Sequence, residues 1–135
     1  MKAADSTVAV AAALEWHEAH EVARSALRGH PVALPAHAAL ETYAVLTRIP
    51  PPLDVSRVVA RDYLSRAFAG PLLTLPAEEH ARLLDVAAVS DLRGGAVYDA
   101  LIGATARHAG ATLITLDRRA TRAYEAVGVE YELLA

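Results

Sequence analysis

Short apolar runs alternate along the chain with longer stretches in which apolar residues recur every three or four positions. The short runs are typical of buried strands, and the longer spacing is typical of helices that pack one face against a core. The clearest strand is Thr112–Leu116, and weaker strands are expected at residues 1–5, 32–34 and 129–134. Residues 72–75 are expected to form a strand or an extended link. Helices are expected at residues 7–14, 16–28, 36–48, 56–68, 77–91, 97–108 and 118–127. Strands separated by helices predict an α/β fold with a central parallel β-sheet of four to five strands flanked by α-helices.

No repeat, low-complexity segment or long linker interrupts this alternation. The strongest breaker is Pro50–Pro52, which is too short to separate domains and is typical of a stiff loop between helices. A length of 135 residues is also ordinary for one domain. We therefore expect residues 1–135 to form a single domain.

The composition favours helices and excludes several kinds of chemistry. Alanine, the best helix former, accounts for 31 of the 135 residues. The absence of cysteine excludes disulfides, thiolate zinc sites, iron–sulfur clusters and cysteine nucleophiles. No apolar run approaches the roughly 20 residues that span a bilayer, and Asp5 comes too early for a signal peptide. We expect a cytoplasmic protein without a membrane partner.

Four acidic residues stand where acids are unusual. Asp5 and Asp117 each follow a predicted strand, and the carboxyl ends of neighbouring parallel strands meet at one edge of a sheet. Asp99 lies near the start of a helix made almost entirely of small and apolar residues. Glu41 lies in the middle of the helix at 36–48, where Ala38 and Val45 share its face.

Carboxylates gathered at one edge would repel each other and raise each other's pKa values unless a positive group compensates them. A divalent cation such as Mg²⁺ or Mn²⁺, which prefers carboxylate oxygens and water, is one solution. His17 and His20 are expected on a charged helix face among glutamates, so a softer metal is not favoured.

Each acid also has an ordinary structural interpretation. Asp5, Asp99 and Asp117 can cap the helices that follow them or lie in their first turns, where the helix dipole favours acids. Glu41 can be a surface residue whose carboxylate reaches water. Two strand-end acids together with two acids on apolar helix faces exceed what capping predicts, and this combination favours the metal site.

The chain resembles the PIN-domain ribonucleases, and specifically the VapC toxins of bacterial VapBC toxin–antitoxin pairs. The resemblance covers essentially the whole chain and rests on four acidic motifs in order. These motifs are residues 5–7 (DST), 41–48 (ETYAVLTR), 94–102 (GGAVYDALI) and 112–120 (TLITLDRRA). Lys2–Ala4 departs from the family because it is less hydrophobic than the strand that usually precedes the first acid.

The resemblance implies a PIN-like fold and a metal-dependent endoribonuclease. Asp5, Glu41, Asp99 and Asp117 would be both the catalytic residues and the ligands of Mg²⁺ or Mn²⁺. Water activated by the metal would hydrolyse the RNA phosphodiester and leave a 5′-phosphate and a 3′-hydroxyl. Ser6 and Thr115 would orient the carboxylates, although both can equally serve as ordinary cap and strand-end residues.

The implied partners are an RNA substrate, a cognate VapB-type antitoxin and a second copy of the chain in a homodimer. The apolar helices at residues 36–68 are the expected contact region for these proteins. A catalytically inactive PIN-like module that binds RNA or protein is the main alternative. A phosphatase of the haloacid dehalogenase kind is disfavoured because Thr7 stands where it needs a second aspartate, and a receiver domain because Lys2 is the only lysine.

The net charge of the chain bears on the expectation that its substrate is RNA. Thirteen basic and sixteen acidic residues give −3, so the chain has no general basic coat for nucleic acid. Setting aside the four candidate ligands leaves 12 acids against 13 bases, a nearly neutral remainder. RNA is therefore a possible substrate, with a metal ion at the acidic edge as the group that would attract its phosphate.

Overall fold

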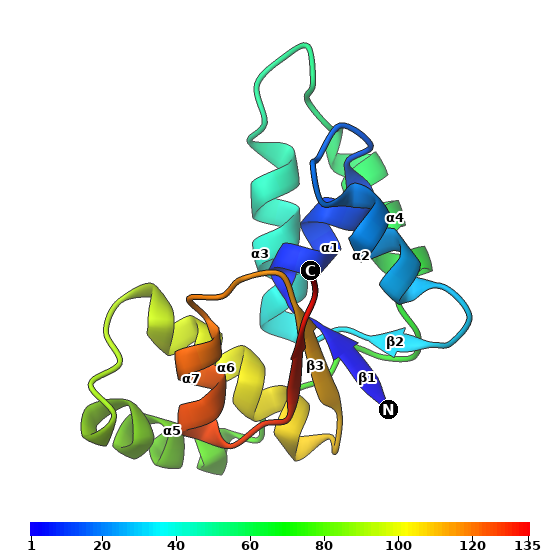
Figure 1. The fold of residues 1–135 in the computed structure, drawn as a ribbon. Coiled ribbons are helices and arrows are strands. Elements are labelled where there is room, and N and C mark those ends of the chain that lie inside the picture. Colours follow the sequence, from blue (N-terminus) through cyan, green and yellow to red (C-terminus); the bar gives the residue numbers. More distant parts are fainter.

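Four short parallel strands form one sheet in the computed structural model, which describes residues 1–135 (Figure 1). The strands are β1 (Lys2–Ala4), β2 (Val32–Ala33), β3 (Thr112–Thr115) and β4 (Tyr131–Leu133), in the order β2-β1-β3-β4. The helices are α1 (Ser6–Ala13), α2 (His20–Leu27), α3 (Ala36–Thr47), α4 (Arg57–Ala67), α5 (Ala77–Val89), α6 (Gly95–His108) and α7 (Thr121–Val127). The predicted α/β fold with a parallel sheet is confirmed. None of the helices is long and apolar enough to cross a membrane.

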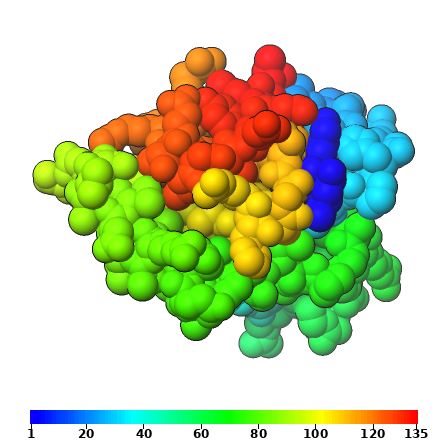
Figure 2. Space-filling model, turned by 90° about the horizontal axis from the view of Figure 1, so that it is seen from below, coloured from blue at the N-terminus to red at the C-terminus, as the bar shows by residue number.

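The weakly hydrophobic first strand occupies the centre of the sheet. Ala3 pairs with Ala33 on one side and Leu113 on the other, and the N–H of Asp5 donates to the carbonyl of Ile114 at 3.1 Å. Figure 2 shows the N-terminal residues between the segment near residue 30 and the segment near residue 110. Ala3 and Ala4 are completely buried. A strand with small side chains can therefore occupy the centre of the sheet, where helices cover both faces.

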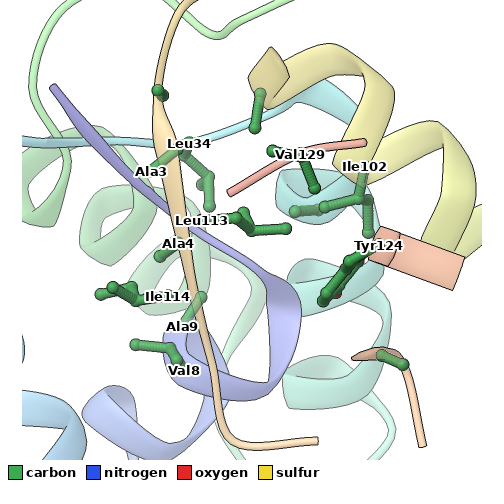
Figure 3. Packing of buried hydrophobic residues seen from close by; sticks show 14 of the residues in the cluster. Ala3, Ala4, Val8, Ala9, Leu34, Ile102, Leu113, Ile114, Tyr124 and Val129 are labelled. Carbon is green, nitrogen blue, oxygen red and sulfur yellow. The ribbon is translucent and has the colours of Figure 1, made fainter. Parts of the chain in front are cut away.

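Helices cover both faces of the sheet. In Figure 1, α5, α6 and α7 gather on one side and α1 to α4 on the other. Successive strand residues point to opposite faces, so Leu113 points toward Ile102 and Tyr124, whereas Ile114 points toward Val8 (Figure 3). All five side chains belong to a buried apolar cluster of 26 residues. This packing fixes the carboxyl edge of the sheet against α1, α3, α6 and α7.

A glycine lets α6 and α7 approach closely. A Cβ atom at Gly103 would lie 2.9 Å from Cγ2 of Val127, a distance that real Cβ atoms essentially never show, and 3.0 Å from Cδ1 of Tyr124, which is tighter than nine in ten real contacts. The side chain of Tyr124 is buried at this contact. The position of the Tyr124 ring therefore depends on the missing side chain at residue 103.

The segment at 72–75, expected to be a strand or an extended link, is an extended link with one bridge between Leu73 and Pro35, since prolines at 71 and 76 flank it and limit its backbone pairing. Three details of the sequence-based prediction are wrong, namely the starts of two helices and the place of His20. The helix expected at 16–28 begins only at His20 after a turn, and the one expected at 118–127 begins at Thr121. His20 is buried and its Nδ1 lies 2.9 Å from the carbonyl oxygen of Ala11, so it does not lie on a charged face.

Candidate active site

Asp5 is held rigidly at the junction of β1 and α1. Its Oδ1 accepts hydrogen bonds from the Thr7 N–H at 3.0 Å, the Thr7 hydroxyl and the Val8 N–H at 3.3 Å, which makes Asp5 the N-cap of α1. Its Oδ2 accepts a hydrogen bond from the Tyr124 hydroxyl at 2.7 Å. Three donors occupy one carboxylate oxygen, so Oδ2 is the oxygen with capacity left for another partner.

Burial raises the pKa of the Asp5 carboxyl above its ordinary value. Hydrogen bonds from Thr115, Thr7 and Tyr124 act in the opposite direction because they favour the ionised form. Only 1% of Asp5 is exposed, and no ion pair involves it. The fold thus supplies dipoles to this carboxylate but no positive charge.

Asp99 shows that the four acids share one electrostatic environment. Its pKa is raised to about 6, first by burial and then by the nearby charges of Asp117, Glu41 and Asp5. These residues come from the carboxyl ends of two neighbouring strands and from α3 and α6, which contact each other. The structure therefore places Asp5, Glu41 and Asp117 near enough to Asp99 for their charges to act on it.

Glu41 carries a buried oxygen without a partner. Its Oε1 is buried and forms no hydrogen bond, while its Oε2 lies 3.7 Å from Nε2 of His37, one helical turn earlier in α3. A buried carboxylate oxygen without a donor or a cation costs free energy, because it has lost its water without replacement. Glu41 is therefore not an ordinary surface acid.

Asp117 combines a local structural role with its place in the group. Its Oδ1 accepts a hydrogen bond from the Arg119 N–H at 2.9 Å, and its own N–H donates to the Thr115 hydroxyl at 3.0 Å. Asp5 thus caps a helix and Asp117 forms a turn, as their ordinary structural interpretation predicts. Both residues also belong to the four acids of the candidate site. Asp99 differs, because α6 begins at Gly95 and Asp99 lies beyond its first turn.

Two side chains that support the site were missed by sequence reasoning. The Thr7 hydroxyl donates to Asp5 and accepts from the Leu116 N–H at 3.0 Å, which links the ends of β1 and β3. Tyr124 reaches Asp5 from α7, 119 positions away, and no local pattern indicates such a contact. Ser6 forms no side-chain hydrogen bond, and the Thr115 hydroxyl accepts from the backbone N–H of Asp117, so the role of both residues in orienting carboxylates stays a prediction.

The donor set fits a hard divalent cation. The site offers carboxylate oxygens, which Mg²⁺ and Mn²⁺ prefer, and one of them is the unpartnered oxygen of Glu41. The fit is one of donor chemistry alone, because no three His, Asp or Glu side chains are arranged in this structure so that they could hold one metal ion. A cation among these carboxylates would offset the repulsion that raises the pKa of Asp99.

Comparison with known proteins agrees with this architecture. The PIN domain family model matches residues 3–126. The chain is 49% identical over 135 residues to Ribonuclease VapC40 of Mycobacterium tuberculosis, a match that covers 99% of both chains. It is also 38% identical over 133 residues to Ribonuclease VapC27 of Mycobacterium tuberculosis, covering 98% of this chain and 96% of that protein. The chain therefore belongs to the PIN-domain family, among its VapC ribonucleases.

Proposed function

We propose that this protein is the toxin of a toxin–antitoxin pair, a metal-dependent endoribonuclease whose Mg²⁺ or Mn²⁺ is held by Asp5, Glu41, Asp99 and Asp117. The observation that carries the proposal is the environment of Asp99, where burial and then the charges of the other three acids raise its pKa to about 6. The unpartnered oxygen of Glu41 supports it independently. The names of the similar proteins, both ribonucleases, support RNA as the substrate. We place its action in the cytoplasm, with the whole chain acting as one domain.

A divalent cation bound here would supply positive charge for the phosphate and lower the pKa of a water molecule toward neutrality. The chain's own residues supply orientation. Thr7 and Tyr124 hold the two oxygens of Asp5, and Thr115 holds the backbone of Asp117. No side chain is needed as a covalent nucleophile, so direct attack by water would leave a 5′-phosphate and a 3′-hydroxyl.

Mapping the cleaved RNA ends after brief induction tests this reaction. We expect defined internal cleavage sites with 5′-phosphate ends in cells that express the wild-type chain. Cells that express the Asp117→Asn variant should show none of these ends, and cells that express Asp91→Asn should show them all, because Asp91 is an exposed acid paired with Arg93. RNA binding without cleavage by the wild-type chain would favour the inactive binding module instead.

The region expected to contact a VapB-type antitoxin carries an apolar groove. A cavity of about 450 Å³ lies between α3, α4 and the segment after α4, and its lining includes Leu40, Tyr43, Leu64, Phe68 and Leu72. Leu40 is 69% exposed, which is costly for a large apolar side chain unless a partner covers it. We propose that the antitoxin occupies this groove and blocks RNA cleavage.

Growth and co-purification test the antitoxin. Induction of the wild-type chain alone should stop growth, and co-expression of its antitoxin should restore it. Leu40→Asp should abolish co-purification and leave RNA cleavage intact, because Leu40 lies outside the acidic site. Normal growth with soluble wild-type chain would contradict the toxin assignment. The proposed homodimer is tested by the molar mass of the purified chain in solution.

A further inference from the structure

A stacked aromatic pair stands beside the acidic site. The rings of His37 in α3 and Tyr98 in α6 lie with their centroids 5.0 Å apart and their planes within 6° of parallel. Both residues lie in the first turns of their helices, where α3 meets α6. The pair therefore joins the two helices that carry Glu41 and Asp99.

Packing in the hydrophobic core does not account for Tyr98, because much of its side chain is exposed. Tyr98 is 54% exposed although His37 covers part of its ring, and its hydroxyl forms no hydrogen bond within the chain. An aromatic side chain fixed by a stacking neighbour loses little further conformational freedom when a ligand contacts it. The ring is thus both ordered and available to solvent.

The pair lies next to two of the four acids, and this location determines which part of a bound RNA could contact it. Tyr98 directly precedes Asp99, and Nε2 of His37 lies 3.7 Å from Oε2 of Glu41. If a phosphodiester lies against these acids, the exposed Tyr98 ring is available to the nucleotide next to it. Bases of unpaired nucleotides stack on aromatic side chains, and this contact accepts any base because every base has a π-face.

We propose that Tyr98, held in place by His37, stacks on an unpaired nucleobase next to the cleaved phosphodiester. The inference rests on the proposed ribonuclease function and adds how the strand is held. The charge of −3 provides little general attraction for RNA, so a stacking contact supplies affinity that a basic surface would otherwise provide. The contact also favours single-stranded over paired RNA at the cleavage site.

Steady-state cleavage tests the stacking contact. The substrate is a short RNA that contains a cleavage site mapped as described above. Tyr98→Leu keeps apolar bulk against His37 but removes the ring, and we expect its KM to rise roughly tenfold with most of the loss in KM rather than kcat. Tyr98→Phe should restore KM to within about twofold of wild type. Trp16→Ala should match wild type, because Trp16 is similarly exposed at 53% but lies in the turn between α1 and α2.

A spectroscopic readout separates stacking from a structural effect. A fluorescent purine analogue placed beside the cleaved bond should be quenched when the RNA binds Asp117→Asn, and this quenching should disappear when Tyr98→Leu is added. Unchanged KM and unchanged quenching in Tyr98→Leu would overturn the inference while leaving the ribonuclease function intact. Weaker antitoxin binding with unchanged KM would assign the ring to a protein partner and would also overturn it. If the wild-type chain yields no cleavage site, the proposed function fails, and the inference fails with it.

Discussion

At Asp99 the carboxylate that serves the site weakens the fold. Burial and the three neighbouring acids raise its pKa from 3.8 to about 6, so the folded chain disfavours the charged form. In the unfolded chain the group ionises at its ordinary, lower value. Its charge therefore costs stability in full above pH 6, and the cost fades as the pH falls through the interval between the two values.

The Asp99→Asn variant tests this cost. In the presence of EDTA we expect the variant to unfold at a higher urea concentration than wild type at about pH 8, and the difference to shrink by about pH 4.5. Asp91→Asn provides the control, because Asp91 is exposed and pairs with Arg93. Equal stability of Asp99→Asn and wild type at the higher pH would mean that the four acids do not interact as described.

Tyr124 offers a second test at the scale of single residues. Tyr124→Phe removes the hydrogen bond to Oδ2 of Asp5 in a buried setting, so we expect a loss of about 1–3 kcal/mol in the free energy of unfolding. Mn²⁺ binding, measured by calorimetry, should weaken roughly tenfold, because residues that orient a ligand affect affinity to this extent.

Tyr63→Phe is the matched control. The Tyr63 hydroxyl donates to the carbonyl oxygen of Ala9 at 2.6 Å, a contact with no acid of the site. This variant should also lose stability but should bind Mn²⁺ as wild type does. If both variants weaken Mn²⁺ binding equally, Tyr124 does not act through Asp5.

The sequence could identify the four acids but not the groups that hold them. Asp5 and Asp117 follow apolar strands, and Glu41 and Asp99 lie on apolar helices, so each stands out locally. Tyr124 and the ring of Tyr98 do not, because their partners Asp5 and His37 lie far away in the chain. The tertiary packing of helices against one edge determines these contacts.

At the scale of the elements, the contact between α6 and α7 sets the position of Tyr124. Gly103→Ala would place a methyl group about 3 Å from Val127 and Tyr124, so both residues would have to shift. Overpacking of this kind typically costs about 1–3 kcal/mol, and we expect that loss in urea unfolding together with weaker Mn²⁺ binding.

Gly95→Ala is the control for this prediction. Nothing lies within 4 Å of a Cβ atom at Gly95, the first residue of α6, so alanine should be tolerated there or should stabilise the helix. Unchanged stability of Gly103→Ala would show that the two helices have room to separate.

Element prediction succeeded where local patterns matched the tertiary environment. Thr112–Leu116 was clear because β3 is buried on both faces, and its prediction is confirmed with its end at Thr115. The segment at 72–75, expected to be a strand or an extended link, lies at the margin of the sheet, where only Leu73 bridges to Pro35. The residues Lys2–Ala4 could not predict that β1 is a central strand. The two alanines are buried there only because helices pack against both faces of the sheet.

At the scale of the whole molecule, the charge balance restricts how RNA can bind. With a net charge of −3, acidic residues outnumber the basic residues that could neutralise phosphates. We expect the affinity of Asp117→Asn for the mapped RNA to fall only gently as the salt concentration rises. The slope of log affinity against log salt concentration should correspond to about two or fewer neutralised phosphates. A titration across salt concentrations in EDTA measures this slope, and a steep slope would contradict the expectation and indicate a basic surface that binds phosphates.

RNA cleavage by purified protein freed of antitoxin tests the central claim most directly. The wild-type chain should cleave a structured RNA with Mg²⁺ or Mn²⁺, and EDTA should stop the reaction. Asp99→Asn should lose at least about 100-fold in rate, since loss of even an outer-shell partner of a metal ligand costs about 10- to 100-fold. Cleavage that persists in EDTA, or equal rates for wild type and Asp99→Asn, would contradict the account.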